Sequence, residues 1–502
     1  MSTATSNSES SFDPRTPVIV GVGQFLNRVD QGADVLEPTD LIAEAVALAD
    51  RDTGASLASK AKVVACVRML SWNYQDPAAL IAEKVGIEGA QTWYPDIGGN
   101  TPQMLLNRLA TEISQGELDV GILCGGETWY TRSSLKRSGD RPDWTVQDLS
   151  VKPTWDGDEK FVMGHPAEHA RAIVQPTQAY PMFETALMHS SGLAPTEYLQ
   201  NVAEMWAGFS DVAAGNEYAW NRESFTASEI GTATDSNRYI GWPYTKHMVS
   251  NPQVEMASAV IVCSAQTAVD AGVPKDRWVF VHSGTDCKDR IMSERLDFDS
   301  SPSIRIGTES CLAAAGIGIE DVAHLDIYSC FPSAVGLFCA EMGIAPTSRP
   351  LTVYGGLCFA GGPWNNPVGH ALASMVSTLR ADAGSYGLVT ANGGHVDKHS
   401  FGLFSTTPPD PSFQYDRPQE AVDATGGRAV LTEYEGDIAI ETWTVMHDRE
   451  NNPETYLGSC LTPSGDRVWA STTDAGAIAA ALTEDIAGHE AHYKADGQIT
   501  LT

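Results

Sequence analysis

The first part of the chain alternates short apolar runs with stretches of helical periodicity. Pro17–Gly23 is a β-branched apolar run that predicts a buried strand, and Thr39 or Asp40 can cap the helix expected over Leu41–Asp50. The alternation continues with strands at 62–69, 91–95 and 120–127 and helices at 77–85 and 104–115. Strands separated by helices are typical of βαβ units, so we expect a parallel sheet covered by helices on both faces.

A second series of the same kind begins after residue 273. Its expected elements are strands at 278–283, 324–330, 387–392 and 401–405 and helices at 303–315, 332–342 and 370–382. Two similar series indicate an internal duplication. Between them, the stretch from Thr128 to Ser250 is rich in Trp, Tyr, Pro and His and ends before a strand at 257–263. A segment of about 120 residues is too long for a loop, so we expect an inserted domain.

The pattern changes again after a proline-rich joint at 406–411. Alternating positions predict a hairpin of strands 428–434 and 437–447 around Glu435-Gly436, and a second pair at 455–461 and 466–470. A short helix at 475–482 and a last hairpin at 488–501 follow. Short antiparallel strands of this kind form a small barrel or sandwich. At the other end, Met1–Thr16 lacks apolar periodicity, which predicts disorder and no signal peptide.

Charge and cysteine content exclude several classes of protein. The chain carries 64 acidic and 32 basic residues, a net charge of −32, which repels nucleic acid and anionic membranes. No apolar run reaches the roughly 18 residues of a membrane span. The nine cysteines form no C-x-x-C pair, and His165 and His169 lack a third metal ligand. We therefore expect a cytoplasmic protein without disulfides, a metal site or a covalently bound cofactor.

Two stretches carry a family resemblance. Gly116 to Gly125-Gly126-Glu127 looks like the passage that leads into the loop domain of thiolases, and Tyr354 to Pro363 looks like their N-G-G-x-x-x-x-G-H-P box. The chain thus resembles the thiolase superfamily, most closely the thiolase-like proteins near the sterol-carrier-type thiolases. The resemblance implies an α/β fold, a duplicated thiolase fold of two βαβαβαββ halves with an inserted loop domain. The C-terminal segment resembles the antiparallel β-barrel domain of the type-1 thiolase-like proteins.

These observations divide the chain into five expected parts. They are a disordered N-terminus (1–16), an N-terminal half (17–127 with 251–273), a loop domain (128–250), a C-terminal half (274–406) and an additional β-barrel domain (407–502).

The resemblance also implies that the thiolase catalytic residues are replaced. The nucleophilic cysteine falls at Gly99 or Asn100, beside a helix N-terminus that would stabilise a thiolate. The histidine of G-H-P is Gly362, the N-E-A-F box reads Tyr328-Ser329-Cys330-Phe331, and the late C-x-G-G cysteine is Asn392. Acyl transfer needs a nucleophile with a base, and Claisen chemistry needs a second base. Conventional thiolysis is therefore not expected.

Three residues are candidates for altered chemistry. Tyr328 lies in a catalytic box and can donate a proton; some sterol-carrier-like relatives without the cysteine are retro-aldolases that use tyrosine with an OB-fold partner. His395 and Cys330 are candidate acids or bases. The alternatives are a packing role for Tyr328, a polar turn histidine at His395, and buried, inert thiols at Cys330 and Cys358.

Basic residues in the expected loop domain point to a CoA ligand. Arg132, Lys136, Arg137 and Arg141 cluster in an otherwise acidic chain, where thiolases hold the nucleotide end of CoA. Their side chains suit a 3′-phosphate, and a solvated charge run is the alternative. Asn251 lies near the position of the family's pantetheine-contacting serine.

The leading hypothesis is a protein that binds CoA or acyl-CoA without thiolysis or Claisen activity. The alternatives are an acyltransferase or retro-aldol lyase that uses Tyr328 or His395, and a scaffold for protein interactions. Whether any reaction is catalysed stays open, and we expect a monomer in preference to a homodimer because an appended domain can block the thiolase dimer face.

Overall fold

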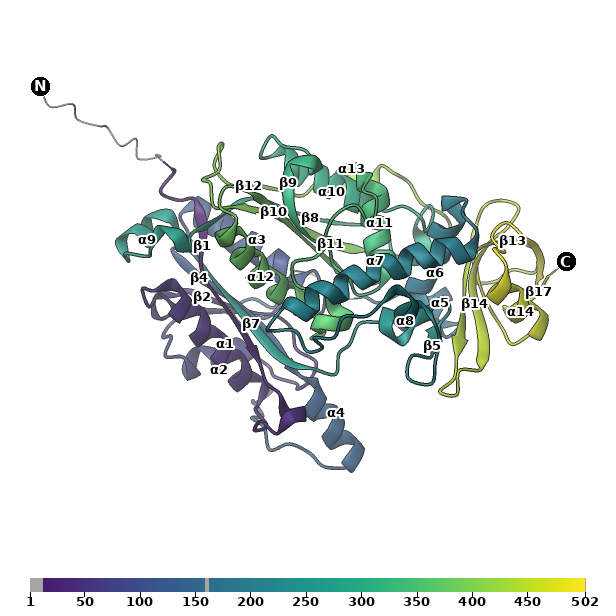
Figure 1. Ribbon diagram of the computed structural model, residues 1–502, viewed down its shortest axis with the longest axis horizontal. Coiled ribbons are helices and arrows are strands. Elements are labelled where there is room, and N and C mark those ends of the chain that lie inside the picture. The colour runs from purple at the N-terminus through teal and green to yellow at the C-terminus, as the bar shows by residue number, and fades with distance from the viewer. Residues whose placement is uncertain (1–11, 159–161, 502) are drawn as a thin grey trace, which may run out of the picture.

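The computed structural model describes residues 12–158 and 162–501 (Figure 1). In this part of the chain, a 10-stranded sheet has the order β3-β2-β4-β7-β1-β8-β11-β10-β9, and β12 pairs with β8. Its strands are β1 (Pro17–Leu26), β2 (Val63–Cys66), β3 (Gln91–Trp93), β4 (Val120–Thr128), β7 (Glu255–Ser264), β8 (Val279–Lys288), β9 (Val322–Asp326), β10 (Tyr386–Gly393), β11 (Lys398–Ser405) and β12 (Gln414–Asp416).

The two halves of this sheet repeat one pairing scheme, which confirms the predicted duplication. In the first half, β7 pairs antiparallel with β1 and β4, and β4 pairs parallel with β2. In the second half, β11 pairs antiparallel with β8 and β10, and β10 pairs parallel with β9. Strands β1 and β8 join the halves, antiparallel to each other. The expected parallel pairing is present within each half, but the sheet is mixed because the last strand of each half runs back antiparallel.

Helices form three layers around the two halves. On the first half, α1 (Pro38–Thr53) contacts β1, β4 and β7, and α2 (Pro77–Lys84) packs beside it. On the second half, α10 (Pro302–Ala313) contacts β8 and β11, and α11 (Pro332–Met342) packs beside it. The middle layer consists of α3 (Thr101–Gln115) and α12 (Pro367–Ala381), which contact each other and strands of both halves.

Glycine allows the closest of these approaches. A Cβ at Gly21 or Gly23 would lie less than 3.0 Å from the carbonyl oxygen of Ala49 or Ala45, so these two glycines let α1 pack directly on β1. Two short helices, α9 (Ala265–Asp270) and α13 (Gln419–Asp423), contact strands of the same sheet.

The inserted segment is largely helical, and its helices lie in two different places on the molecule. Its elements are α4 (Trp129–Ser138), α5 (Pro166–His169), α6 (Pro176–Ser191), α7 (Pro195–Gly215), α8 (Ala227–Gly231), β5 (Tyr239–Gly241) and β6 (Tyr244–Thr245). Figure 1 shows α6 and α7 running across the body, whereas α4 lies apart at its lower end. Before α5, Trp155 exchanges backbone hydrogen bonds with Tyr94 and Thr92 (2.9 and 3.1 Å) and so covers edge strand β3.

The C-terminal segment forms a second antiparallel sheet, as predicted, but the sheet is not a closed barrel. Its order is β15-β14-β13-β16-β17, joined by β5 of the inserted segment. The elements are β13 (Gly436–His447), β14 (Pro453–Leu461), β15 (Arg467–Thr472), α14 (Ala475–Thr483), β16 (Glu490–Tyr493) and β17 (Ile499–Leu501). The predicted pairs at 455–470 and 488–501 form.

Two further sequence predictions are wrong. Residues 428–434 form no strand beyond a single bridge at Val430, because their backbone bonds run to Glu294 and Arg467, so β13 pairs with β14 and β16 instead. Residues 12–16 of the predicted disordered N-terminus are held against the fold: Phe12 packs edge-on against Trp278 at 5.6 Å. Residues 1–11 lie outside the described part.

The two sheets are joined around Arg467, whose side chain is fully buried. Its guanidinium donates to Glu441 at 2.6 Å and to the carbonyl oxygens of Ser293 and Arg295 at 2.8 and 2.6 Å. Trp469 donates from Nε1 to the Ser293 hydroxyl at 2.8 Å, and that hydroxyl donates to Glu168 of α5. One buried cluster therefore fixes the C-terminal sheet, the β8–α10 connection and the inserted segment together.

Arg467→Met is expected to destabilise the protein by roughly 3–5 kcal/mol, because it leaves the Glu441 carboxylate without its main partner. Urea unfolding followed by tryptophan fluorescence measures this, since Trp469 lies in the same cluster. The matched control is Arg449→Met at an exposed arginine, with an expected change of about 0.5 kcal/mol or less. Equal losses of stability in the two variants would contradict the role of Arg467 as the buried partner of Glu441.

Candidate functional site

The stretches that correspond to the thiolase catalytic boxes meet at the N-terminus of α3. A Cβ built on Gly99 would lie less than 3.0 Å from both the Tyr328 hydroxyl and the Asn392 backbone oxygen. The Gly98 N–H donates to Asn365 Oδ1 at 3.2 Å, which brings in the stretch that follows Gly362. Gly99, Tyr328 and Asn392 are thus neighbours in space, and the Gly362 stretch reaches them through Asn365.

Other side chains fill the space that the thiolase residues would need. Tyr328 lies against Gly99, and Ser250 Oγ lies where a Cβ on Gly362 would be. Asn100 Oδ1 lies between Gly98 and Gly393. The cavity beside Tyr328 and Asn392 has a volume of only about 10 Å³, room for a single water molecule. The site is therefore tightly packed.

Burial keeps the two candidate acids of this site protonated. Burial raises the pKa of Tyr328 well above its ordinary value, and it raises the pKa of the Cys330 thiol to about 12. Tyr180 stacks on Phe331 with ring centroids 4.4 Å apart and accepts from Asn392 Nδ2 at 3.1 Å. Neither Tyr328 nor Cys330 is poised as a nucleophile, and the phenol remains a proton donor. Cys358 is equally inert, since burial raises its pKa to about 12.

His395 does not line the small cavity beside Tyr328. Burial, with a smaller contribution from His169, lowers its pKa to about 4, so the imidazole is neutral. Neither ring nitrogen has a hydrogen-bond partner among the described residues. His399, the second residue of β11, lines the small cavity beside Tyr328, and its Nε2 lies 3.6 Å from Asp289 Oδ2.

The basic cluster lies on α4 and the loop after it. Lys136, Arg137 and Arg141 are exposed, and Arg132 is half-buried, with its guanidinium 6.0 Å from the Trp72 ring. The helix begins beside the Gly362 box, where Trp129 packs on Trp364 at 4.8 Å.

Asn251 connects the same two regions. Its backbone oxygen accepts from the Gly362 N–H at 2.9 Å, and its Oδ1 accepts from the Gln253 N–H at 3.0 Å. Gln253 in turn accepts from the Ser133 hydroxyl of α4 at 2.6 Å. The proposed nucleotide-binding and pantetheine-binding residues are therefore on adjoining segments.

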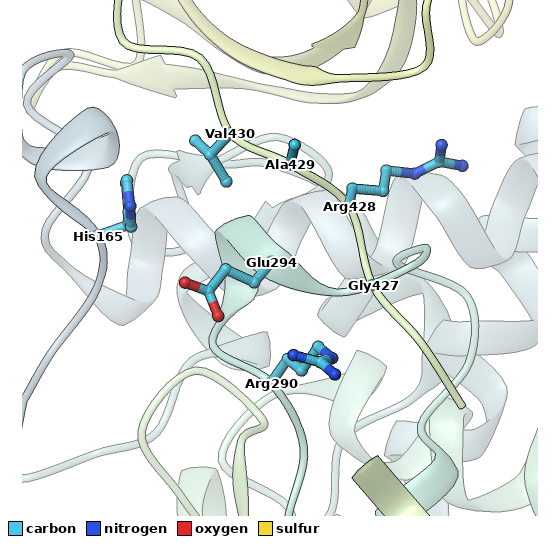
Figure 2. Close-up of a pocket in the computed structure, with 7 residues that line it drawn as sticks. All are labelled: His165, Arg290, Glu294, Gly427, Arg428, Ala429 and Val430. Atoms are coloured by element: carbon cyan, nitrogen blue, oxygen red, sulfur yellow. The ribbon is translucent and has the colours of Figure 1, made fainter. Parts of the chain in front are cut away.

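A separate polar cavity of about 450 Å³ lies between His165, Glu294 and residues 427–430 (Figure 2). The two arginines that line this cavity form hydrogen bonds to the backbone. Arg290 donates to the Gly426 oxygen at 2.8 Å, and Arg428 donates to the oxygens of Leu296 and Gly465. His165 Nδ1 caps α5 by accepting from Ala167 N–H at 3.1 Å. The described residues contain no group of three or more His, Cys, Asp or Glu side chains suited to a metal ion.

Sequence reasoning missed two of the residues that fill the site, Ser250 and Tyr180. Both residues lie in the inserted segment, outside every motif. The one sequence feature that relates to them is Gly362, the glycine that faces Ser250. All nine cysteines are free and buried, and no helix of the described residues is long and apolar enough to cross a membrane.

Comparison with known proteins agrees with this geometry. Residues 418–498 match the family described as thiolase-like protein type 1 additional C-terminal domain. A monomeric SCP2-thiolase-like protein type 1 from Mycobacterium smegmatis is 30% identical, with a TM-score of 0.84 over 98% of this chain and 100% of that chain. No curated protein matches.

Two more distant structures share the fold alone. The Ltp2–ChsH2(DUF35) aldolase is 17% identical, with a TM-score of 0.58 over 78% of this chain and 98% of that chain. The dimeric peroxisomal thiolase of Saccharomyces cerevisiae is 13% identical, with a TM-score of 0.57 over 79% of this chain and 98% of that chain. Full coverage at 30% identity gives the family: the chain belongs to the SCP2-thiolase-like proteins of type 1.

Proposed function

We propose that this protein binds CoA or an acyl-CoA and does not catalyse thiolysis or Claisen condensation. The observation that carries the proposal is the packing at Gly99, where the Tyr328 hydroxyl takes the place of a nucleophilic side chain. The replaced histidine at Gly362 leads to the same conclusion, because Ser250 fills its space. Without a thiolate and its base, no covalent acyl intermediate forms.

The proposed CoA site runs from α4 to Asn251. Three exposed cations, Lys136, Arg137 and Arg141, would face the 3′-phosphate of the nucleotide end. Asn251, tied to α4 through Gln253, would lie along the pantetheine. A ligand that stays on this side needs no access to the packed site at Tyr328. The monomer fits this proposal, since edge strand β3 is already paired with the segment at Trp155.

Gly99→Cys is expected to restore no cleavage of acetoacetyl-CoA and to destabilise the protein by about 1–3 kcal/mol, because the new side chain collides with Tyr328. Thermal unfolding and a thiolysis assay test this. The control Gly208→Cys, on α7 with nothing within 4 Å of its Cβ, keeps the wild-type melting temperature. Thiolysis by Gly99→Cys would disprove the packing argument.

The wild-type protein is expected to bind CoA more tightly than dephospho-CoA in calorimetry, because the latter lacks the 3′-phosphate. The triple change Lys136→Gln, Arg137→Gln, Arg141→Gln should remove this preference and weaken CoA binding about tenfold. A control with Lys60→Gln and Lys152→Gln, both exposed, keeps the preference. If the triple variant binds CoA with unchanged affinity, CoA does not bind at these three cations.

A retro-aldol lyase is the second candidate, favoured by the position of Tyr328 where the catalytic boxes meet. The solved aldolase with the same fold is a complex with a DUF35 protein, and the C-terminal sheet here would be the covalently linked counterpart. This function requires the packed site to open, because the cavity beside Tyr328 holds about 10 Å³.

Tyr328→Phe decides between the two candidates. If Tyr328 is the proton donor, cleavage of a β-hydroxyacyl-CoA by the wild-type protein should fall by about 10²–10⁴-fold in the variant, while CoA binding is unchanged. Absence of cleavage by the wild-type protein supports the binding function. Cleavage that survives in Tyr328→Phe excludes the tyrosine mechanism.

A further inference from the structure

The stretch that contains Gly362 presents one large apolar side chain to solvent. Every residue from Tyr354 to Ala373 is buried except Trp364, whose exposed fraction is 38%. Its φ is +49°, in the left-handed region that a bulky residue rarely adopts. Backbone strain of this kind persists chiefly at active sites and ligand-binding sites. An exposed tryptophan in such a conformation is therefore a candidate contact for a ligand.

The residues that follow Trp364 hold it in this position. Asn365 Nδ2 donates to the Arg68 carbonyl oxygen at 2.8 Å, and Asn366 Nδ2 donates to the Ser258 hydroxyl at 2.9 Å. Both asparagines are buried. Because these bonds fix the turn from below, the exposure of the Trp364 side chain is a property of a rigid segment.

Three further aromatic residues lie close to Trp364 and the glycines beside it. Trp129 packs edge-on against Trp364 with ring centroids 4.8 Å apart, and the rings of Tyr130 and Trp220 are 5.9 Å apart. A Cβ at Gly361 would lie 3.5 Å from Trp220 Cβ. These three residues are partly exposed. We call Trp129, Tyr130, Trp220 and Trp364 the aromatic wall.

The charged groups next to the aromatic wall have partners of their own. The Arg28 guanidinium lies 4.5 Å from the Trp220 ring and pairs with Asp30 at 2.6 Å. Glu255 is buried at the first turn of α4, where it accepts from the Thr131 N–H at 2.8 Å. The wall therefore offers a ligand mainly an apolar surface.

The aromatic wall and the exposed cations lie at opposite ends of α4. Trp129 is the first residue of this helix, and Lys136 and Arg137 are in its last turn. At 1.5 Å per residue they are about 10–12 Å apart along the helix axis. In CoA the adenine ring and the 3′-phosphate are attached to one ribose, whereas the pantetheine arm extends away from it. A nucleotide held at the cations therefore leaves the aromatic wall to the thioester end.

The former thiolase site has no room for an acyl group. Ser250 Oγ lies where a Cβ on Gly362 would be, and the cavity beside Tyr328 has a volume of only about 10 Å³. A space that holds a single water molecule does not hold an alkyl chain. Burial of apolar surface then favours contact of the chain with the aromatic wall.

We propose that this protein prefers an acyl-CoA to free CoA, and that the acyl group lies outside the former thiolase site, against Trp364 and the rest of the aromatic wall. The proposal rests on the CoA-binding function proposed above and names its ligand class, a thioester with an apolar acyl group of medium length. The aromatic wall contains no thiol, imidazole or carboxylate, so the thioester stays intact.

Calorimetry on the full chain with CoA, butyryl-CoA and octanoyl-CoA tests the proposal. Octanoyl-CoA should bind about tenfold more tightly than CoA, with butyryl-CoA between them, because a longer chain covers more of the aromatic wall. Trp364→Gln should reduce this preference to about twofold or less with an unchanged CoA affinity, and Trp364→Phe should retain most of it. The control Leu193→Gln, at a residue with the same exposed fraction of 38%, keeps the wild-type preference.

Fluorescence gives a second measurement that needs no variant. An octanoyl-CoA brominated at the chain end, whose bromine quenches tryptophan on contact, should quench the wild-type protein more than octanoyl-CoA does. Equal quenching by the two ligands would overturn the proposal, and so would a preference that Trp364→Gln does not alter. Equal affinity of the wild type for CoA and octanoyl-CoA would overturn it and leave the CoA proposal standing, whereas binding of neither ligand would overturn both.

Discussion

The buried ion pair of Arg467 with Glu441 organises the molecule, because it holds backbone as well as a carboxylate. Its bonds to the oxygens of Ser293 and Arg295 fix the connection after β8. From there, Arg295 pairs with Asp289 at 3.4 Å, and Asp289 lies 3.6 Å from His399, which lines the small cavity at Tyr328. A continuous series of buried polar contacts therefore leads from the C-terminal sheet to the place where the thiolase boxes meet. The appended domain is part of the structure around that place, and its loss would remove the donor that the Ser293 and Arg295 carbonyl oxygens now have.

The substitutions at the former catalytic positions form pairs. Tyr328 requires a glycine at 99, and Ser250 requires a glycine at 362, because a Cβ at either position would overlap the partner. A larger side chain at Gly99 or Gly362 would therefore clash with the residue packed against it, and the site is a well-packed part of the core. Changes at two such paired positions are therefore expected to have non-additive effects on stability.

Much of the fold can be predicted from periodicity, and the failures have physical reasons. The order of strands and helices in both halves follows from apolar runs and amphipathic stretches, and α11 spans the predicted 332–342. The direction of β7 and β11 could not be predicted, since a fully buried strand reads the same whether its neighbour is parallel or antiparallel. Residues 428–434 alternate like a strand, but their partners are distant in sequence. The replaced boxes were found through the family resemblance. In contrast, the exposure of Trp364 depends on a left-handed backbone in the middle of a buried stretch, which no local pattern reveals.

The pairing of the Trp155 segment with β3 also bears on aggregation through this edge strand. An exposed edge strand can accept a strand from any neighbouring chain, and the segment that covers it here is about sixty residues away in the same chain. A tethered strand competes at an effective concentration of roughly millimolar, far above that of other copies in a cell. The insertion therefore favours pairing of β3 within its own chain over pairing with a strand of another copy.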